Sequence, residues 1–188
     1  YSLMKFIKFL LIIFITINSP VKADLNQNLI DEFNQGGKLI FIRHAHAPGG
    51  GDPVNFDISK CNTQRNLSDS GRKQAYKIGS LFKVNKISFD KVYSSEWCRC
   101  KETALIAFNK FETKFFLNSF FSSKFAQNKD SQIKKFKRFI RNWDGKNNLI
   151  FVTHYVVIYE ILGYTPSSGE IIISNKDLKV IDTIEIEY

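Results

Sequence analysis

The chain has 188 residues, of which 44% are hydrophobic, and it carries a formal net charge of +9 at pH 7. This length suits one domain with a full core, and no linker, repeat or low-complexity segment divides it. The positive charge favours anionic partners. The composition therefore argues against a multidomain or repeat protein and for one domain that meets anionic molecules.

The first 23 residues have the pattern of a secretory signal peptide. Two lysines precede Phe9–Ile17, an apolar run that is about half of the roughly 20 residues needed to span a bilayer as a helix. Val21–Ala23 then offers the small-residue pattern that a signal peptidase accepts. The sequence predicts a cleaved signal peptide over residues 1–23, a mature domain over residues 24–188, export to the periplasm, and no membrane anchor after cleavage. The alternative is an uncleaved tether.

Short apolar runs alternate with helical patterns along the mature chain. Lys38–Arg43 ends abruptly in histidine, as a buried strand does when it delivers side chains to a loop. Ser68 and Ser95 are candidate N-caps of helices. In chain order we expect a strand over 38–43, a loop over 44–66, helices over 68–82 and 95–108 around a strand at 91–94, a strand at 114–117, a helix over 130–143, a strand at 149–153, a helix over 156–162, and strands at 171–174 and 180–187. This alternation predicts an α/β three-layer sandwich with a mostly parallel central sheet, whose sites lie at the carboxyl ends of the strands.

The helix expected over residues 130–143 concentrates basic side chains. They are interleaved with Ile133, Phe136, Ile140 and Trp143 at helical spacing. We interpret this pattern as the solvated face of an amphipathic helix and expect no nucleic-acid partner. Binding of nucleic acid or anionic lipid to this face is the alternative. Removal of residues 1–23, which hold three lysines and no acid, leaves a net charge of +6 on the mature chain.

Three cysteines, Cys61, Cys98 and Cys100, remain after cleavage. Export would place them in an oxidising compartment, where one pair can form a disulfide. On a helix, Cys98 and Cys100 point about 200° apart, so at most one of them can meet Cys61. We favour a Cys61–Cys98 disulfide, and three unpaired thiols are the alternative.

All three histidines of the chain follow two of the expected strands. His44 and His46 come directly after the first strand, and His154 comes directly after the strand at residues 149–153. Parallel neighbours would bring these loops together. Arg43 adjoins the first histidine, and Arg99 lies in the first turn of an expected helix. Guanidinium groups suit the oxygens of a phosphoryl group, and a neutral imidazole can attack phosphorus to form a phosphohistidine without a metal or another cofactor.

Four segments in this order resemble the motifs of a known family. They are Phe41–Ala45, Leu67–Ala75, Ser94–Ala104 and Val152–His154. The chain resembles the histidine phosphatase superfamily, with its phosphoglycerate-mutase-like fold. Cys61–Leu67 and Ser168–Glu170 are similar to segments of its small exported branch.

The resemblance implies a role for each residue of the expected cluster. His44 would be the nucleophile, and Arg43, Arg99 and His154 would bind and stabilise the transferred phosphoryl group. Arg65, just before the helix that begins at about residue 68, would be an additional phosphate contact.

The general acid that protonates a poor leaving group is not settled by the resemblance. Larger relatives place a carboxylate after the third strand, whereas residues 118–121 hold none. The acid-phosphatase branch has an aspartate after the second histidine, where this chain has Tyr155. The candidates are therefore Asp52, Asp57 and Glu170.

We favour Glu170 as the catalytic acid because it should lie at the mouth of the sheet near His154. His46 is a possible substitute. If the chain has no acid, substrates with good leaving groups, such as anhydrides or phosphohistidine, are favoured.

The sequence predicts a metal-independent hydrolase of phosphomonoesters or related phosphorylated compounds. A phosphorylated small molecule or envelope sugar is the expected substrate, and nothing in the sequence indicates the oligomeric state. One alternative is a phosphate- or phosphosugar-binding protein without turnover. Another is a metal hydrolase that uses His44, His46, His154 and the two cysteines of Cys98–Cys100, but it would need a supporting carboxylate and a longer barrel.

Overall fold

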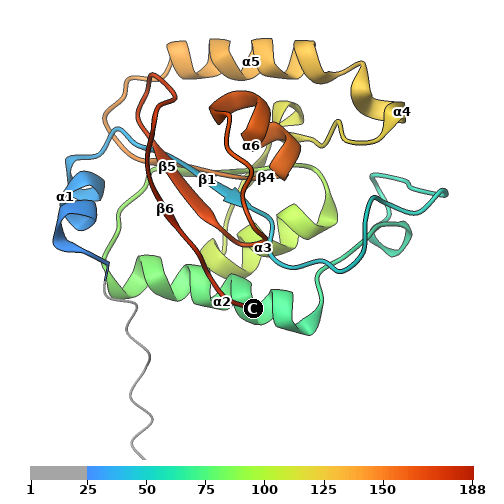
Figure 1. Ribbon diagram of the computed structural model, residues 1–188, viewed down its shortest axis with the longest axis horizontal. Coiled ribbons are helices and arrows are strands. Elements are labelled where there is room, and N and C mark those ends of the chain that lie inside the picture. The colour runs from blue at the N-terminus through green and yellow to red at the C-terminus, as the bar shows by residue number, and fades with distance from the viewer. Residues whose placement is uncertain (1–24) are drawn as a thin grey trace, which may run out of the picture.

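A six-stranded sheet forms the centre of the computed structural model, which describes residues 25–188 (Figure 1). The predicted signal peptide, residues 1–23, lies outside the described residues. The strands follow the order β3-β2-β4-β1-β5-β6. Their bounds are Leu39–Arg43 for β1, Lys91–Ser94 for β2, Glu112–Thr113 for β3, Leu149–Thr153 for β4, Ile171–Ser174 for β5 and Val180–Ile184 for β6.

The β1–β4 pair sets the position of the site. These two strands are parallel and in register from Leu39 opposite Leu149 to Arg43 opposite Thr153. β2 also pairs in parallel with β4 and β3, whereas β5 and β6 complete the sheet as antiparallel neighbours. The register places the residues that follow β1 and β4, His44 and His154, side by side at the same edge.

Helices cover both faces of the sheet, so the fold has three layers. Above the sheet in Figure 1 lie α5 and α6, and below it lie α2 and α3. The helices are α1 Gln27–Gln35, α2 Asp69–Val84, α3 Cys98–Phe108, α4 Ser123–Ala126, α5 Lys129–Arg141 and α6 Tyr155–Leu162, with short 3₁₀ turns η1 at Cys61–Thr63 and η2 at Phe115–Leu117. The predicted α/β three-layer sandwich is confirmed.

The alternation of side chains along the strands divides the core into two halves. In β1, Ile40 and Ile42 pack toward α1, α2 and α3, whereas Leu39 and Phe41 pack toward α5 and α6. All four side chains are fully buried. Because both faces are covered, the central strands are continuous apolar runs without the alternating pattern of a half-exposed sheet.

The expected strand at residues 114–117 is wrong. In this part of the chain only Glu112–Thr113 is a strand, which pairs with β2. The chain then turns into η2, where the Leu117 amide donates to the Lys114 carbonyl. Phe116 and Leu117 are buried in the half of the core that contains α5. Burial of two successive apolar side chains against one helix layer favours the turn over an extended strand, which would point them to opposite faces.

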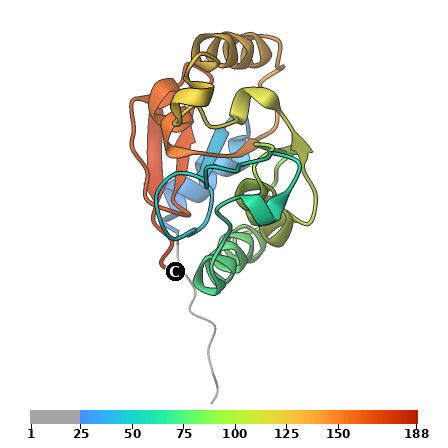
Figure 2. The same cartoon turned by 90° about the vertical axis from the view of Figure 1, so that its right-hand side faces the viewer.

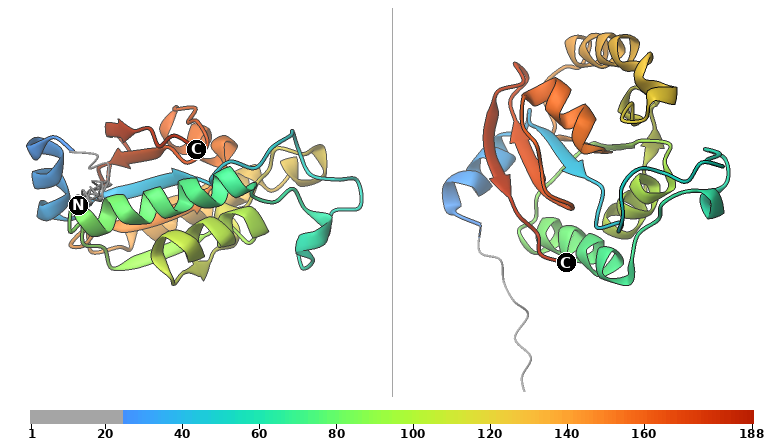
Figure 3. Two further views of the ribbon diagram at one scale, coloured as in Figure 1. Left: turned by 90° about the horizontal axis from the view of Figure 1, so that it is seen from below. Right: turned by 45° about the vertical axis from the view of Figure 1, so that its right-hand side comes forward.

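The loop after β1 projects beyond the end of the sheet, as both views of Figure 3 show. It runs from His44 to Leu67 and includes η1, as expected from its glycines and prolines. Figure 2 looks onto this side of the molecule.

Within residues 25–188, none of the helices has the length and apolarity that a membrane crossing requires.

The α2–α3 contact depends on a glycine. A Cβ atom at Gly79 of α2 would overlap the backbone oxygen of Ala107 in α3. The absence of a side chain lets the two helices approach closely.

We expect Gly79→Ala to lower the free energy of unfolding by about 1–3 kcal/mol, because the helices must separate to admit the methyl group. Urea unfolding measures the change. Gly50→Ala is the matched control, since a Cβ atom there would meet no atom within 4 Å. Equal stability of the two variants would contradict this account of the packing.

Candidate active site

His44 presents one unprotonated ring nitrogen to the site. It follows β1, is 2% exposed, and its Nδ1 lies 2.8 Å from the carbonyl oxygen of Ala45. A carbonyl only accepts, so Nδ1 carries the proton and Nε2 keeps its lone pair. The Nε of Arg99 donates to this Nε2 at 3.2 Å. The backbone thus fixes the tautomer in which Nε2 can act as a nucleophile.

His154 lies opposite His44, with 5.4 Å between the ring centroids. Its Nδ1 is 3.5 Å from Nη2 of Arg99, and its Nε2 is 2.9 Å from the hydroxyl of Ser95. That hydroxyl donates in turn to Oδ1 of Asn118 at 3.1 Å. Because Arg99 only donates and the Ser95 proton is used on Asn118, the proton of His154 lies on Nε2.

Both histidines are held neutral. Burial and then the neighbouring charge of Arg99 lower the pKa of His44 and of His154 well below the usual value for histidine. A neutral imidazole has a free lone pair at neutral pH. The site therefore meets the first requirement of nucleophilic catalysis by histidine.

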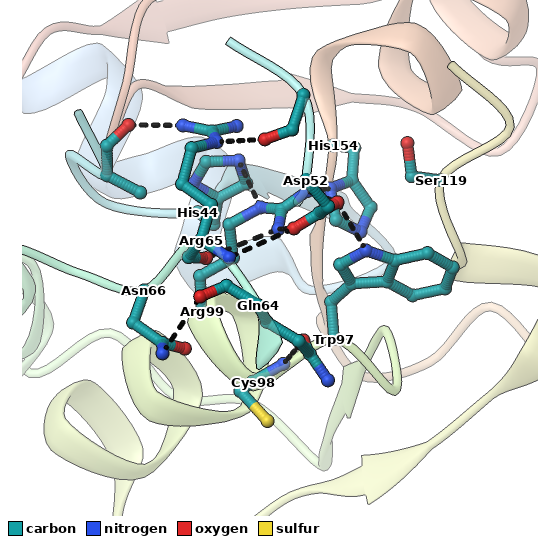
Figure 4. A network of polar contacts seen from close by, with 12 residues as sticks. His44, Asp52, Gln64, Arg65, Asn66, Trp97, Cys98, Arg99, Ser119 and His154 are labelled. Atoms are coloured by element: carbon teal, nitrogen blue, oxygen red, sulfur yellow. Dashed lines mark hydrogen bonds and ion pairs between the residues drawn. The ribbon is translucent and has the colours of Figure 1, made fainter. Parts of the chain in front are cut away.

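Arg99 joins the two histidines to a carboxylate. It lies in the first turn of α3 and is 3% exposed. Its Nη1 donates to Oδ1 of Asp52 at 2.7 Å and its Nη2 to Oδ2 at 3.3 Å (Figure 4). Trp97 Nε1 donates to the same carboxylate at 3.0 Å, and the Arg65 amide does so at 3.1 Å.

Arg43 lies at the end of β1 with spare hydrogen-bonding capacity. Its Nη1 donates to the carbonyl of Pro166 at 2.8 Å, and its guanidinium lies 5.4 Å from the ring centroid of Tyr155. Its Nε is buried and has no hydrogen-bond partner among residues 25–188. Buried donors are rarely left unpaired, so this atom is a candidate contact for a bound anion.

Arg65 holds the loop after β1. Its Nε donates to the Gly51 carbonyl at 2.8 Å, and its Nη1 donates to the Ala47 carbonyl. The side chain also lines the cavity. The predicted phosphate contact is thus near the site, but these bonds direct its donors to the loop backbone.

These groups surround a cavity of about 240 Å³. Two arginines and two histidines form its floor, and aromatic side chains line its rim. The residues that line it are Arg43, His44, Gly49, Gly50, Gly51, Asp52, Arg65, Trp97, Arg99, Ser119, Phe121, Ser122, Phe125, His154 and Tyr155. The arrangement offers concentrated donors for an anion below an apolar entrance.

Glu170 does not lie in this cavity, which corrects the expectation that it is the catalytic acid. Its carboxylate is 2% exposed and accepts from the hydroxyl of Tyr164 at 2.5 Å and from the amide of Ser167 at 2.6 Å. Burial lowers the pKa of Arg43, and the charge of Glu170 partly opposes this effect. Glu170 therefore supports Arg43 and the preceding loop.

Two other candidates for the acid also lie outside the cavity. His46 stacks on Tyr188 with 4.0 Å between ring centroids and contacts the hydroxyl of Ser68 through Nδ1. The carboxylate of Asp57 bonds Ser59 and Lys60. The structure brings together Arg43, His44, Asp52, Arg65, Arg99 and His154 from the sequence-derived candidates.

The sequence does not indicate that Ser95, Trp97 and Asn118 belong to the site. Ser95 was expected to cap a helix, but α3 begins three residues later, and Ser95 instead bonds His154. A tryptophan and an amide have no catalytic pattern of their own. Only the close approach of α3 and η2 to the end of β4 identifies them.

A disulfide joins Cys61 in the loop to Cys98 at the start of α3. Cys100 is buried and free, and burial raises its pKa to about 12. Gln64 strengthens the same connection, because its Oε1 accepts from the amide of Cys98 at 2.9 Å. The loop is thereby held against the helix that carries Arg99.

The sequence comparison with family models matches one segment of the chain. Residues 39–119 match the family described as "Histidine phosphatase superfamily (branch 1)". This segment is similar to the histidine phosphatase superfamily, and the fold of the chain is phosphoglycerate-mutase-like. No curated protein matches the chain in sequence.

Three solved structures illustrate the likeness in fold. The protein histidine phosphatase SixA complexed with tungstate is 14% identical with a TM-score of 0.53, over 80% of this chain and 96% of that chain. A protein described as an alpha-ribazole-5'-P phosphatase from Escherichia coli is 16% identical with a TM-score of 0.56, over 80% and 96%. Phosphoglycerate mutase from Thermus thermophilus is 14% identical with a TM-score of 0.51, over 80% and 99%.

The neutral histidines predict a pH-dependent stability. A histidine whose pKa is lowered by folding binds its proton only in the unfolded state, so its stabilisation is present above the unfolded pKa of about 6.5 and is lost as pH falls below it. For two such residues we expect the free energy of unfolding to fall by about 2 kcal/mol between pH 7 and pH 5.5. Urea unfolding of the wild type and of His44→Gln/His154→Gln tests this, since the variant should lose most of the dependence. An equal dependence in both proteins would contradict the assignment of neutral side chains.

The disulfide predicts a second stability difference. It closes a loop between residues 37 positions apart, so Cys61→Ser/Cys98→Ser should lower the free energy of unfolding by about 3–4 kcal/mol. A reducing agent should destabilise the wild type similarly and leave the variant unchanged. If the reducing agent destabilised the variant as much as the wild type, the loss of stability would come from Cys100 or another cause and not from the disulfide.

Proposed function

We propose that the protein is a phosphatase that hydrolyses phosphomonoesters or related phosphorylated compounds through a phosphohistidine on His44. The observation that carries this proposal is the unprotonated Nε2 of His44 at the floor of a cavity lined by Arg43, Arg99 and His154. The lone pair of Nε2 bonds phosphorus, and the bond from phosphorus to the leaving oxygen breaks with its electron pair. Water then attacks phosphorus and releases inorganic phosphate and free His44.

The arginines stabilise the charge on the transferred group. Arg99 donates from the floor beside His44, and the unpaired Nε of Arg43 supplies a second donor from the end of β1. Both groups are buried or half-buried, where a hydrogen bond to an anion is stronger than in water. His154 contributes a third side chain to the same cavity.

A phosphorylated small molecule is the proposed substrate class. The cavity of about 240 Å³ suits a phosphoryl group with a modest attached group, and Trp97, Phe121 and Phe125 offer apolar surface to the latter. The names of two similar structures, a protein histidine phosphatase and an alpha-ribazole-5'-P phosphatase, agree with phosphorylated substrates as a class. Imidazole attack requires no metal, and the proposed reaction is metal-independent.

We also propose that the protein acts in the periplasm on a phosphorylated envelope component. The predicted signal peptide motivates this location, and the Cys61–Cys98 disulfide is consistent with an oxidising compartment. The same disulfide removes Cys98 from the ligand set of the metal-hydrolase alternative.

A binding protein without turnover is the second candidate. The observation in its favour is the Asp52 carboxylate on Arg99, which occupies donors that a phosphoryl group would use.

The test of the proposed function is hydrolysis of p-nitrophenyl phosphate by residues 24–188 in the presence of EDTA. We expect turnover in the wild type and a loss of at least about 10³-fold in His44→Ala, because the nucleophile is removed. His46→Ala is the matched control, since that ring lies outside the cavity and should retain activity. Turnover that vanishes with EDTA would overturn metal independence. Phosphate binding that depends on Arg99, without turnover of any phosphate ester, would favour the binding protein.

A further inference from the structure

Asp52 is the only carboxylate that lines the cavity among residues 25–188. It lies on the glycine loop, which we define as residues 48–53, between the end of β1 and η1. Its side chain is 17% exposed, so it remains open to the cavity. No other carboxylate in the described chain is in a position to exchange a proton with a group bound there.

The loop is built to hold Asp52 at this point. Gly49 and Gly51 adopt φ values of +89° and +69°, which favour glycine, and they reverse the chain so that Asp52 faces α3. Arg65 holds the loop in place because its Nε donates to the carbonyl of Gly51. Trp97, which is buried, donates from Nε1 to the carboxylate itself at 3.0 Å.

The position of Asp52 on Arg99 makes it a competitor for a phosphoryl group. Arg99 uses both Nη atoms on Asp52, in the paired geometry that also suits two phosphoryl oxygens. A phosphoryl group that bonds His44 must use some of these donors, because Arg99 also contacts His44. Its arrival therefore weakens the ion pair of Asp52 and places a second anion beside the carboxylate.

Both changes favour a protonated Asp52. Arg99, Trp97 and the Arg65 amide lower the pKa of Asp52 against the opposing effect of burial. When the donors of Arg99 turn to the phosphoryl group, the largest favourable contribution is reduced and the repulsion from the phosphoryl charge is added. A carboxyl group that gains its proton as substrate binds is suited to donate it during bond cleavage.

We propose that Asp52 is the catalytic acid that protonates the leaving oxygen. The proposal rests on the proposed function. As Nε2 of His44 bonds phosphorus, the bond to the leaving oxygen breaks and the carboxyl proton of Asp52 passes to that oxygen, which departs as an alcohol. The resulting carboxylate then accepts a proton from the water that attacks the phosphohistidine, so each cycle consumes one water and restores Asp52.

The decisive experiment compares two substrates in Asp52→Asn. Glycerol phosphate has a poor leaving group that needs a proton, whereas p-nitrophenolate leaves without one. We expect kcat/KM to fall by about 10²-fold or more for glycerol phosphate and by less than about tenfold for p-nitrophenyl phosphate. The ratio of the two values does not depend on the fraction of folded protein. Asp57→Asn, an exposed carboxylate outside the cavity, should keep the wild-type ratio.

Inorganic phosphate provides a second measurement that needs no turnover. Titration by calorimetry should show tighter binding to Asp52→Asn than to the wild type, because the competing charge is gone while the amide oxygen still accepts from Trp97. A purely structural contribution of Asp52 would instead weaken phosphate binding and lower both rates equally, and that result would overturn the inference.

The failure of the proposed function gives a different pattern. If the wild type hydrolyses neither substrate, both proposals are overturned together. If the wild type hydrolyses both substrates, His44→Ala hydrolyses neither and Asp52→Asn keeps the wild-type ratio, the phosphohistidine route stands and only the assignment of Asp52 fails.

Discussion

The parallel pairing of β1 with β4 is the constraint on which the site depends. The register that sets Arg43 opposite Thr153 delivers His44 and His154 to one edge of the sheet. Arg99 then enters from α3, which follows the neighbouring strand β2, and contacts both rings. A shift of one residue in this pairing would move every side chain of a strand to the opposite face and separate the histidines.

Burial gives the cluster its chemical character. Two imidazoles and a guanidinium in the same cavity cannot all be charged without repulsion in a region that solvates charge poorly. The cost is relieved by neutral histidines, with the positive charge kept on Arg99 and balanced by Asp52. Burial therefore has two effects: it keeps an unprotonated nitrogen on His44, and it requires a carboxylate to balance the charge of Arg99. The glycine loop supplies that carboxylate, Asp52.

Much of the fold was predictable because its signals are local. The strands around Ile40 and Ile150 are apolar runs that end in histidine, and Ser68 accepts from the amide of Gly71 as an N-cap, as its position indicated. Helix α1 was not predicted, and the strand expected at 114–117 was wrong, because tertiary packing of Phe116 and Leu117 outweighed their strand propensity.

The site was predictable in its phosphate-binding part and less so in its acid. Arg43, His44, Arg99 and His154 follow strands or begin a helix, so their meeting follows from the topology. The position of Asp52 depends on the path of a loop rich in glycine, and this path cannot be predicted from a strand or helix pattern in the sequence. Glu170 was expected in the site because it is close to β1 along the sheet. Its carboxylate instead accepts from Tyr164 and Ser167, and these bonds turn it away from the cavity.

The chain of hydrogen bonds behind His154 passes through two neutral side chains before it reaches a carboxylate. The hydroxyl of Ser95 contacts Nε2 of His154 and donates to Oδ1 of Asn118, and Nδ2 of Asn118 donates to the carboxylate of Glu96. Gln132 of α5 donates to the backbone carbonyl of Asn118 at 2.7 Å. Amides do not gain or lose protons in the range where enzymes work. No carboxylate among residues 25–188 contacts His154 directly, whereas the carboxylate of Asp52 lies on Arg99 inside the cavity. The fold thus holds Asp52 inside the cavity and keeps Glu96 two neutral side chains away from His154.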